Sequence, residues 1–133
     1  MMLMTAVSPT RIALVGHCGP DSFALKSSIM GFVPNAQVEM VASLQDFESR
    51  IDAFDLHVVN RVLDGQFPDE SGIELIRSHH ENHPPMMLIS NFPESLQEAV
   101  AAGGVMGFGK RAMRSEEARI ALHNALGMTS TSS

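Results

Sequence analysis

The stretch Met86-Met87-Leu88-Ile89-Ser90 is apolar over its first four residues and then turns polar. A short, continuous apolar run of this kind is typical of a parallel β-strand that is covered on both faces of its sheet. Similar runs recur at residues 12–15, 38–41, 56–59 and 105–108. The run at 38–41 is interrupted by Glu39, which suits a strand at the sheet edge. The sequence therefore predicts five strands, one of them an edge strand.

The segments between these runs have the apolar spacing of helices. Leu25, Ile29 and Phe32 recur at i, i+4 and i+7, so they share one helical face. Gly31 and Gly127 stand where helices are expected to end. The other helices are predicted from the apolar stripes Leu44, Phe47 and Ile51; Ile73 and Ile76; Leu96, Ala99 and Val100; and Ala118, Leu122, Ala125 and Leu126.

Strands that alternate with helices imply a parallel sheet with right-handed crossovers. Five such units in 133 residues fit an α/β, flavodoxin-like (βα)5 three-layer sandwich, with a five-stranded parallel sheet in the order 2-1-3-4-5. We expect a flexible leader at 1–10, one domain at 11–127 and a disordered tail at 128–133. The carboxyl ends of the strands should meet at one crevice, which the sequence lines with Gly16, His17, Asn60, Ser90 and Lys110.

Charge and composition narrow the function. The chain has a net charge of -6 and nine scattered basic residues, which argues against a nucleic-acid partner. The nearest approach to a basic patch is Lys110, Arg111 and Arg114. Cys18 is the single cysteine, so no intrachain disulfide is possible and a reducing compartment fits. No stretch approaches the roughly 20 apolar residues of a membrane span, so we expect a cytoplasmic protein without a membrane partner.

Four segments together carry a resemblance to a known family. They are Asp55-Leu-His-Val-Val-Asn60, Ser71-Gly-Ile-Glu-Leu-Ile76, Met86-Met-Leu-Ile-Ser90 and Gly103-Gly-Val-Met-Gly-Phe-Gly-Lys110. With these segments the chain, from Arg11 to about Leu126, resembles the receiver domains of two-component response regulators.

The resemblance implies a phosphorylation site at the crevice. Receiver domains are phosphorylated on an Asp at the end of strand 3, and an acidic pair after strand 1 helps to hold Mg²⁺. A Ser or Thr after strand 4 and a Lys after strand 5 bind the phosphoryl oxygens; Ser90 and Lys110 match these positions. The acceptor position is Asn60, and the acidic pair is replaced by Gly16 and His17. A neutral amide is a poor nucleophile and Mg²⁺ prefers charged oxygen ligands, so we expect neither phosphorylation at this position nor Mg²⁺ binding.

We therefore predict a degenerate receiver that is not an enzyme and has no cofactor. It would act as a protein-interaction module in two-component or phosphorelay signalling. Its partner would be a signalling protein such as a histidine kinase, or a second copy of the chain, bound through the face of helix 4, strand 5 and helix 5. The candidate contact residues are Gln97, Met106, Arg111, Met113 and Arg119.

Two alternatives stay open at this point. Asp64, or one of its neighbours Asp69 and Glu70 in the long loop 61–71, could serve as a substitute phosphoacceptor. An alternative of another class is a flavodoxin-like domain that binds a small molecule or catalyses a reaction in the crevice. The chain lacks a Gly-x-Gly-x-x-Gly motif after strand 1, which argues against the dinucleotide form of that alternative.

Several polar residues have simpler structural explanations. We expect Lys110 to form a hydrogen bond with the side-chain oxygen of Asn60, because a buried ammonium needs acceptors. Ser90 is expected to be a hydrogen-bonding loop residue rather than a nucleophile. A metal site is not expected from the pair His17 and Cys18 or from His79, His80 and His83, since neither group offers a full ligand set.

Overall fold

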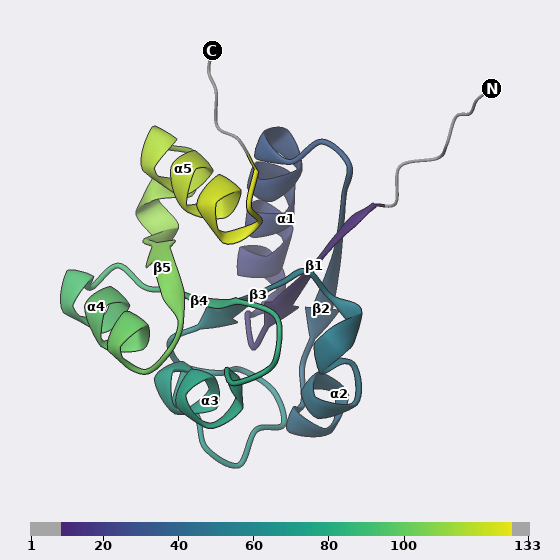
Figure 1. Ribbon diagram of the computed structural model, residues 1–133, viewed down its shortest axis with the longest axis vertical. Coiled ribbons are helices and arrows are strands. Elements are labelled where there is room, and N and C mark those ends of the chain that lie inside the picture. Colours follow the sequence, from purple (N-terminus) through teal and green to yellow (C-terminus); the bar gives the residue numbers. More distant parts are fainter. Residues whose placement is uncertain (1–8, 129–133) are drawn as a thin grey trace.

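The computed structural model describes residues 9–128 as a three-layer α/β sandwich (Figure 1). Five parallel strands form one sheet in the order β2-β1-β3-β4-β5, which confirms the predicted topology and places β2 at an edge. The strands are β1 (Thr10–Val15), β2 (Ala36–Val41), β3 (Leu56–Asn60), β4 (Met86–Ile89) and β5 (Val105–Phe108).

Helices cover both faces of the sheet. In Figure 1, α1 and α5 lie on one side of the strands, and α2, α3 and α4 lie on the other. The helices are α1 (Gly19–Phe32), α2 (Leu44–Ser49), α3 (Gly72–His79), α4 (Pro93–Ala101) and α5 (Glu116–Ala125), with two 3-10 turns, η1 (Ile51–Ala53) and η2 (Lys110–Ala112).

Serines begin three of these helices. The side chains of Ser43, Ser71 and Ser115 each accept a hydrogen bond from the backbone N–H three residues later. A cap of this kind is worth about 1 kcal/mol, because it satisfies a donor that the first helical turn leaves unpaired. These caps fix where α2, α3 and α5 start.

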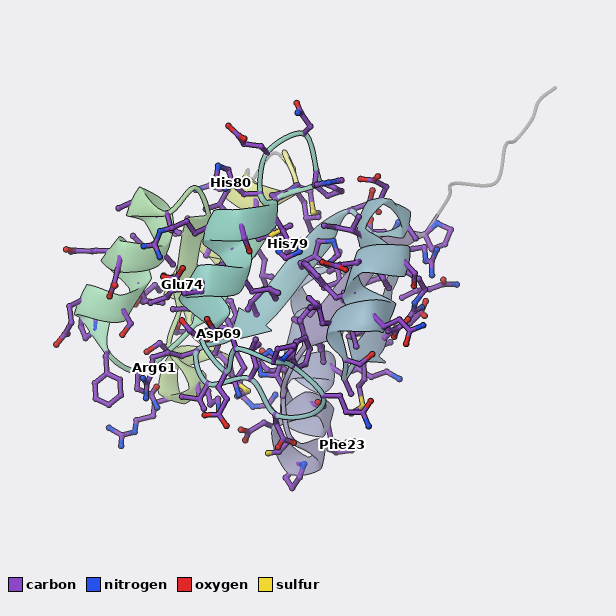
Figure 2. The ribbon with its side chains drawn as sticks, turned by 90° about the horizontal axis from the view of Figure 1, so that it is seen from below. Phe23, Arg61, Asp69, Glu74, His79 and His80 are labelled. Atoms are coloured by element: carbon purple, nitrogen blue, oxygen red, sulfur yellow. The ribbon has the colours of Figure 1, made fainter. Side chains whose placement is uncertain are left out.

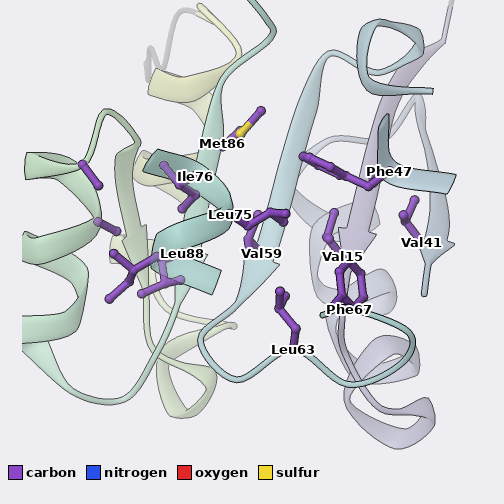
Figure 3. Close-up of a cluster of buried hydrophobic side chains, with 14 of the residues drawn as sticks. Val15, Val41, Phe47, Val59, Leu63, Phe67, Leu75, Ile76, Met86 and Leu88 are labelled. Carbon is purple, nitrogen blue, oxygen red and sulfur yellow. The ribbon is translucent and has the colours of Figure 1, made fainter. Parts of the chain in front are cut away.

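The two faces of the sheet carry separate hydrophobic clusters. The cluster under α2, α3 and α4 contains Phe47, Val59 and Leu88 (Figure 3). The cluster under α1 and α5 contains Leu25 and Phe108. Side chains of successive strand residues point to opposite faces, so each continuous apolar strand contributes to both clusters.

The loop 61–71 is mostly exposed but contributes two side chains to the core. Leu63 and Phe67 are buried in the cluster of the α2–α4 face (Figure 3). Gln66 pairs with the segment after β2, because Leu44 N donates to Gln66 O at 2.9 Å and Gln66 N donates to Ala42 O at 2.8 Å. These contacts hold the loop against the segment that follows the carboxyl end of β2.

The predicted boundaries need correction at several points. β1 begins at Thr10, inside the expected leader, and α1 continues one residue past Gly31 to Phe32. Met128 packs against the core, so the expected tail does not begin there. The remainder of the leader, residues 1–8, and of the tail, residues 129–133, lies outside the described residues.

Across residues 9–128, no helix is both long and apolar enough to cross a lipid bilayer.

Candidate functional site

A pocket of about 250 Å³ opens at the carboxyl ends of β3 and β4, beside η2. Three of the five predicted crevice residues line it, namely Asn60, Ser90 and Lys110. Gly16 and His17 are not among its lining residues. The full lining is Asn60, Arg61, Val62, Ile89, Ser90, Asn91, Phe92, Lys110 and Arg111.

The Asn60 side chain is held by its amide nitrogen. Nδ2 donates to Gly16 O at 3.0 Å and to Val62 O at 2.8 Å. Both partners are carbonyl oxygens, which only accept hydrogen bonds, so the position requires a donor. A carboxylate in the same place would face these two oxygens with acceptors alone. The end of β3 is therefore built around an amide.

Gly16, the first of the two positions after β1, has no room for a side chain. Its φ is +74°, and a Cβ added there would lie 2.6 Å from Leu63 Cδ2. The Gly16 carbonyl also accepts a hydrogen bond from Asp64 N at 2.9 Å. Leu63, delivered by the loop 61–71, thus fills the space beside Gly16, and the sequence offers no signal that would have predicted this contact.

His17 is buried rather than directed into the pocket. It is 5% exposed, and its Nε2 donates to Val58 O at 2.9 Å. Burial lowers the pKa of His17 to about 4. Its Nδ1 has no hydrogen-bond partner within the described part of the chain. The His17 ring is therefore neutral at physiological pH. This chain thus has an uncharged side chain at a position where the receiver resemblance implies an acidic one.

Lys110 pairs with Asp21 and not, as predicted, with Asn60. Lys110 Nζ lies 2.6 Å from Asp21 Oδ2, and the hydrogen bond from Lys110 lowers the pKa of Asp21 below its usual range. The correction has a simple cause, because a carboxylate attracts an ammonium more strongly than an amide oxygen does. Asp21 lies in the first turn of α1, directly after β1. Because Asp21 follows β1 so closely in the sequence, its carboxylate could have been predicted to lie at the crevice.

Ser90 is 4% exposed and serves the turn after β4. Its Oγ accepts a hydrogen bond from Phe92 N at 3.1 Å. The next residue, Asn91, also supports the crevice wall, since its Oδ1 accepts from Arg111 N at 3.0 Å. The Ser90 bond shapes the turn after β4, and the Asn91 bond ties that turn to η2.

The acidic residues of the loop 61–71 do not line the pocket. Asp64 and Glu70 are exposed, and Asp69 accepts a hydrogen bond from Ser71 N at 2.9 Å. Figure 2 shows Asp69 near the start of α3, with Arg61 on the α4 side of the same loop. The structure thus does not bring any of the three carboxylates to the Ser90 and Lys110 side of the crevice.

Two of the three histidines, His79 at the end of α3 and His83 after it, lie beside carboxylates of α2 and η1. His79 Nε2 lies 2.8 Å from Glu48, and His83 Nδ1 lies 2.8 Å from Asp52. α3 ends at His79, so His79 and His83 do not share a helical face. Sequence reasoning overlooked His57, which is fully buried, with Nε2 donating to Ile51 O at 2.8 Å.

The residues at the crevice do not fit a divalent cation. Across residues 9–128, no group of three or more His, Cys, Asp or Glu side chains is placed to hold a metal ion. The Asn60 nitrogen is directed at two carbonyl groups, Gly16 has no side chain, and Asp21 is engaged by Lys110. The hard, charged oxygen ligands that Mg²⁺ prefers are therefore not assembled here.

Gly107 lies in β5, beside β4, and has no room for a side chain. A Cβ on Gly107 would collide with the carbonyl oxygen of Leu88. The pairing of β4 with β5 shifts register between Met87 and Ile89, which brings the two backbones close at this point. The missing side chain is thus a consequence of the sheet geometry.

Solved structures share this architecture. The signal receiver domain of a DNA-binding response regulator from Colwellia psychrerythraea 34H matches with a TM-score of 0.69 at 11% identity, covering 90% of this chain and 99% of that chain. A response regulator from Thermotoga maritima matches with a TM-score of 0.70 at 16% identity and the same two coverages. The fold is that of receiver domains.

A further receiver-fold structure is a dimer. The beryllofluoride-activated NtrC4 receiver domain matches with a TM-score of 0.69 at 16% identity, covering 88% of this chain and 96% of that chain. No family model matches the sequence, and none of the curated proteins matches it. The likeness therefore concerns the receiver fold, while the chemistry of the crevice has to be argued from the residues described above.

Proposed function

We propose that this chain is a degenerate receiver domain that signals through protein contacts and is not phosphorylated at the usual position. The observation that carries the proposal is the Asn60 amide, which donates to Gly16 O and Val62 O. A nucleophile at this position would need a free carboxylate oxygen. Asn60 has no such oxygen and is committed as a donor.

Two neighbouring features support the same proposal. Leu63 fills the space beside Gly16, so the position after β1 that an acidic residue would occupy is closed by a loop side chain. Lys110, which would otherwise meet a phosphoryl oxygen, is paired with Asp21. Phosphoryl transfer would have to proceed without its nucleophile and without charge neutralisation by a metal.

The test is incubation with acetyl phosphate and Mg²⁺, followed by desalting and intact mass measurement. We expect no mass increase of one phosphoryl group. A phosphoryl group mapped to Asp64, Asp69 or Glu70 would contradict the proposal and favour a substitute acceptor. A parallel reaction with Asn60→Asp asks whether the acceptor alone is missing; we expect this variant to stay unmodified as well, because Gly16 and His17 still supply no metal ligand.

The face formed by α4, β5 and α5 is the proposed contact surface. It exposes large apolar side chains, with Val100 41%, Met106 49% and Ile120 40% exposed. Gln97 and Arg111 are exposed as well. Met113 packs against the core and Arg119 is bound to Glu116, so these two are weaker contact candidates than the sequence suggested.

A charge on this face should weaken its contacts. We expect Met106→Glu to reduce self-association measured by sedimentation, or binding to a cognate histidine kinase domain. Phe23→Glu is a matched control, since Phe23 is 78% exposed on α1, away from this face. Equal loss in both variants, or in neither, would argue against the α4–β5–α5 surface.

A further inference from the structure

The excess negative charge of the chain is confined to one part of the sequence. Residues 44–83 contain nine Asp and Glu and three Arg, whereas the rest of the chain has six acidic and six basic residues. The whole net charge of -6 therefore belongs to this stretch, which comprises α2, η1, β3, the loop 61–71, α3 and the turn that follows. Figure 1 shows α2 and α3 on the same side of the sheet, so the charge is concentrated on one side of the molecule.

A groove of about 270 Å³ opens in this acidic surface, between α2, α3 and the loop 61–71. Its inner wall is apolar, because Phe67 and Leu75 are buried there and Leu44 is half-buried. The side chains of Asp69 and Glu74 also line the groove and are exposed. No Lys or Arg is among its lining residues. The α2–α3 groove therefore combines an apolar interior with a negatively charged rim.

The loop that forms one wall of the α2–α3 groove is held at both of its sides. Val62 and Ser71 pair in an antiparallel bridge, which closes the base of the loop. At the other side, Leu44 N donates to Gln66 O at 2.9 Å, which attaches the loop to the start of α2. A groove that is already formed loses less conformational entropy on binding than one that has to be ordered.

The carboxylates at the rim are accessible to a cation from another molecule. Asp69 Oδ1 accepts a hydrogen bond from the backbone N–H two residues later, and within the described part of the chain Asp69 forms no ion pair. Glu74 pairs with Arg77, but both side chains are about half exposed, and exposed pairs of this kind contribute little. His79, in the same wall, lies beside Glu48.

We propose that the α2–α3 groove is a second docking surface, which binds a segment of a partner protein that carries Lys or Arg beside an apolar side chain. The apolar side chain enters the groove against Phe67 and Leu75, and the cation pairs with Asp69 or Glu74. The surrounding negative charge attracts a basic segment and repels an acidic one. None of the lining residues belongs to α4, β5 or α5, so the domain can hold two proteins at once.

The test uses a synthetic peptide, acetyl-Ala-Leu-Arg-Ala-Leu-Arg-Ala-amide, titrated into the isotope-labelled full chain. One matched peptide has Gln in place of each Arg, and another has Ser in place of each Leu. We expect saturable binding of the first peptide, with changes in the backbone amide signals of Leu44, Asp69 and Leu75. Each matched peptide should bind about tenfold more weakly, because it lacks either the charges or the apolar side chains.

Two outcomes of the peptide titrations would overturn the proposal. One is that the first peptide does not saturate the chain. The other is that the Ser peptide binds as tightly as the first, because attraction by charge alone does not require the groove.

Charge variants of the chain locate the peptide. Asp69→Asn keeps the oxygen that accepts from the loop backbone, and Glu74→Gln changes an exposed helix position, so both variants should fold. Each should weaken Kd by about threefold, the loss expected for one exposed charge pair. Asp64→Asn is the matched control, because Asp64 is exposed in the same loop and does not line the groove. An equal loss in Asp64→Asn, or no loss in either groove variant, would refute the proposal.

Met106→Glu separates this surface from the α4–β5–α5 face. Met106 is exposed in β5 and does not line the groove, so its substitution should leave the Kd of the peptide unchanged. A loss of peptide binding in Met106→Glu would place the peptide on the α4–β5–α5 face and would refute a second surface. Because the peptide titration does not depend on contacts of the α4–β5–α5 face, the two proposals can fail separately.

Discussion

Lys110 and Asp21 are 89 residues apart in the chain, and their side chains meet at 2.6 Å. The contact joins η2, which follows β5, to the first turn of α1. Because the carboxylate comes from the helix and not from the end of β3, Lys110 has an anionic partner that is independent of Asn60. Lys110 is therefore held in an ion pair at the crevice without any ligand.

The Lys110–Asp21 pair should show a measurable but modest coupling. Both side chains are about a third exposed, so we expect a coupling free energy of about 0.5–1 kcal/mol in a cycle of Asp21→Asn and Lys110→Gln. The pKa of folded Asp21 lies below its ordinary value of 3.8, so this stability is present above that pH and is lost as the pH falls through the folded pKa. Urea unfolding measures the cycle; a matching cycle of Asn60→Ala and Lys110→Gln should give a coupling near zero.

Asn60→Asp should destabilise the fold at neutral pH. The substitution replaces the donor to Gly16 O and Val62 O with an acceptor, and we expect a cost of about 1–3 kcal/mol. Asn91→Asp is the control, since Asn91 uses its oxygen as an acceptor and a carboxylate preserves that role. Denaturant unfolding of both variants checks the prediction. Equal stabilities would show that the amide nitrogen of Asn60 does not hold the end of β3.

Stability should fall in mild acid because of His17. The unfolded chain takes up a proton near pH 6.5 and the folded chain only near pH 4, so the unfolded state binds more protons between these values. Stability that is complete above pH 6.5 is therefore lost as the pH falls toward 4, by on the order of 3 kcal/mol. Burial also lowers the pKa of His57, which adds a change of the same sign.

Histidine variants separate this effect from general acid unfolding. The free energy of unfolding of His17→Gln, measured by urea titration at a series of pH values, should depend less on pH in this window than that of the unaltered chain. His83→Gln should retain the dependence, because His83 is exposed and lies beside Asp52 at the surface. An unaltered pH profile in His17→Gln would mean that the ring does not resist protonation in the folded state.

Gly107→Ala should be among the most damaging small substitutions. The new Cβ would collide with the Leu88 carbonyl oxygen in the neighbouring strand, and we expect a loss of about 1–3 kcal/mol. Gly31→Ala is the control, because a Cβ there meets no atom within 4 Å and the residue is helical. That variant should gain about 0.5–1 kcal/mol. Thermal or urea unfolding of the two variants checks this prediction. A loss of stability in Gly107→Ala alone would show that the close approach of β4 and β5 is the cause, whereas a similar loss in both would not.

Mg²⁺ should leave the melting temperature unchanged at millimolar concentration. Only a ligand that binds the native state stabilises it, and the crevice presents no set of charged oxygen ligands. Thermal unfolding with Mg²⁺, compared with Na⁺ at equal ionic strength, checks this expectation. A rise in the melting temperature that is specific to Mg²⁺ and disappears in Asp21→Asn would contradict this expectation. It would identify Asp21 as a metal ligand.

The sequence by itself determined the fold. Continuous apolar runs such as Met86–Ile89 are short and are separated by segments with helical spacing, so they predict the parallel sheet. Five such units in a chain of this length fit the order 2-1-3-4-5. Hydrophobic burial of this kind depends on the local pattern of residue types, and the chain displays that pattern directly. The same reasoning placed Asn60, Ser90 and Lys110 at one edge, because strand ends in a parallel sheet converge.

Only the tertiary structure decided which side chains meet there. Leu63 against Gly16, Asp21 beside Lys110 and the register shift at Gly107 each depend on how segments distant in sequence approach one another. A loop or the first turn of a helix has no periodic residue pattern that predicts where its side chains point. A shift of a few ångströms in such a segment changes which side chain it contacts. The strand pattern is a local property of the chain, whereas these contacts are properties of the packed molecule, and they determine the charge and the shape of the crevice.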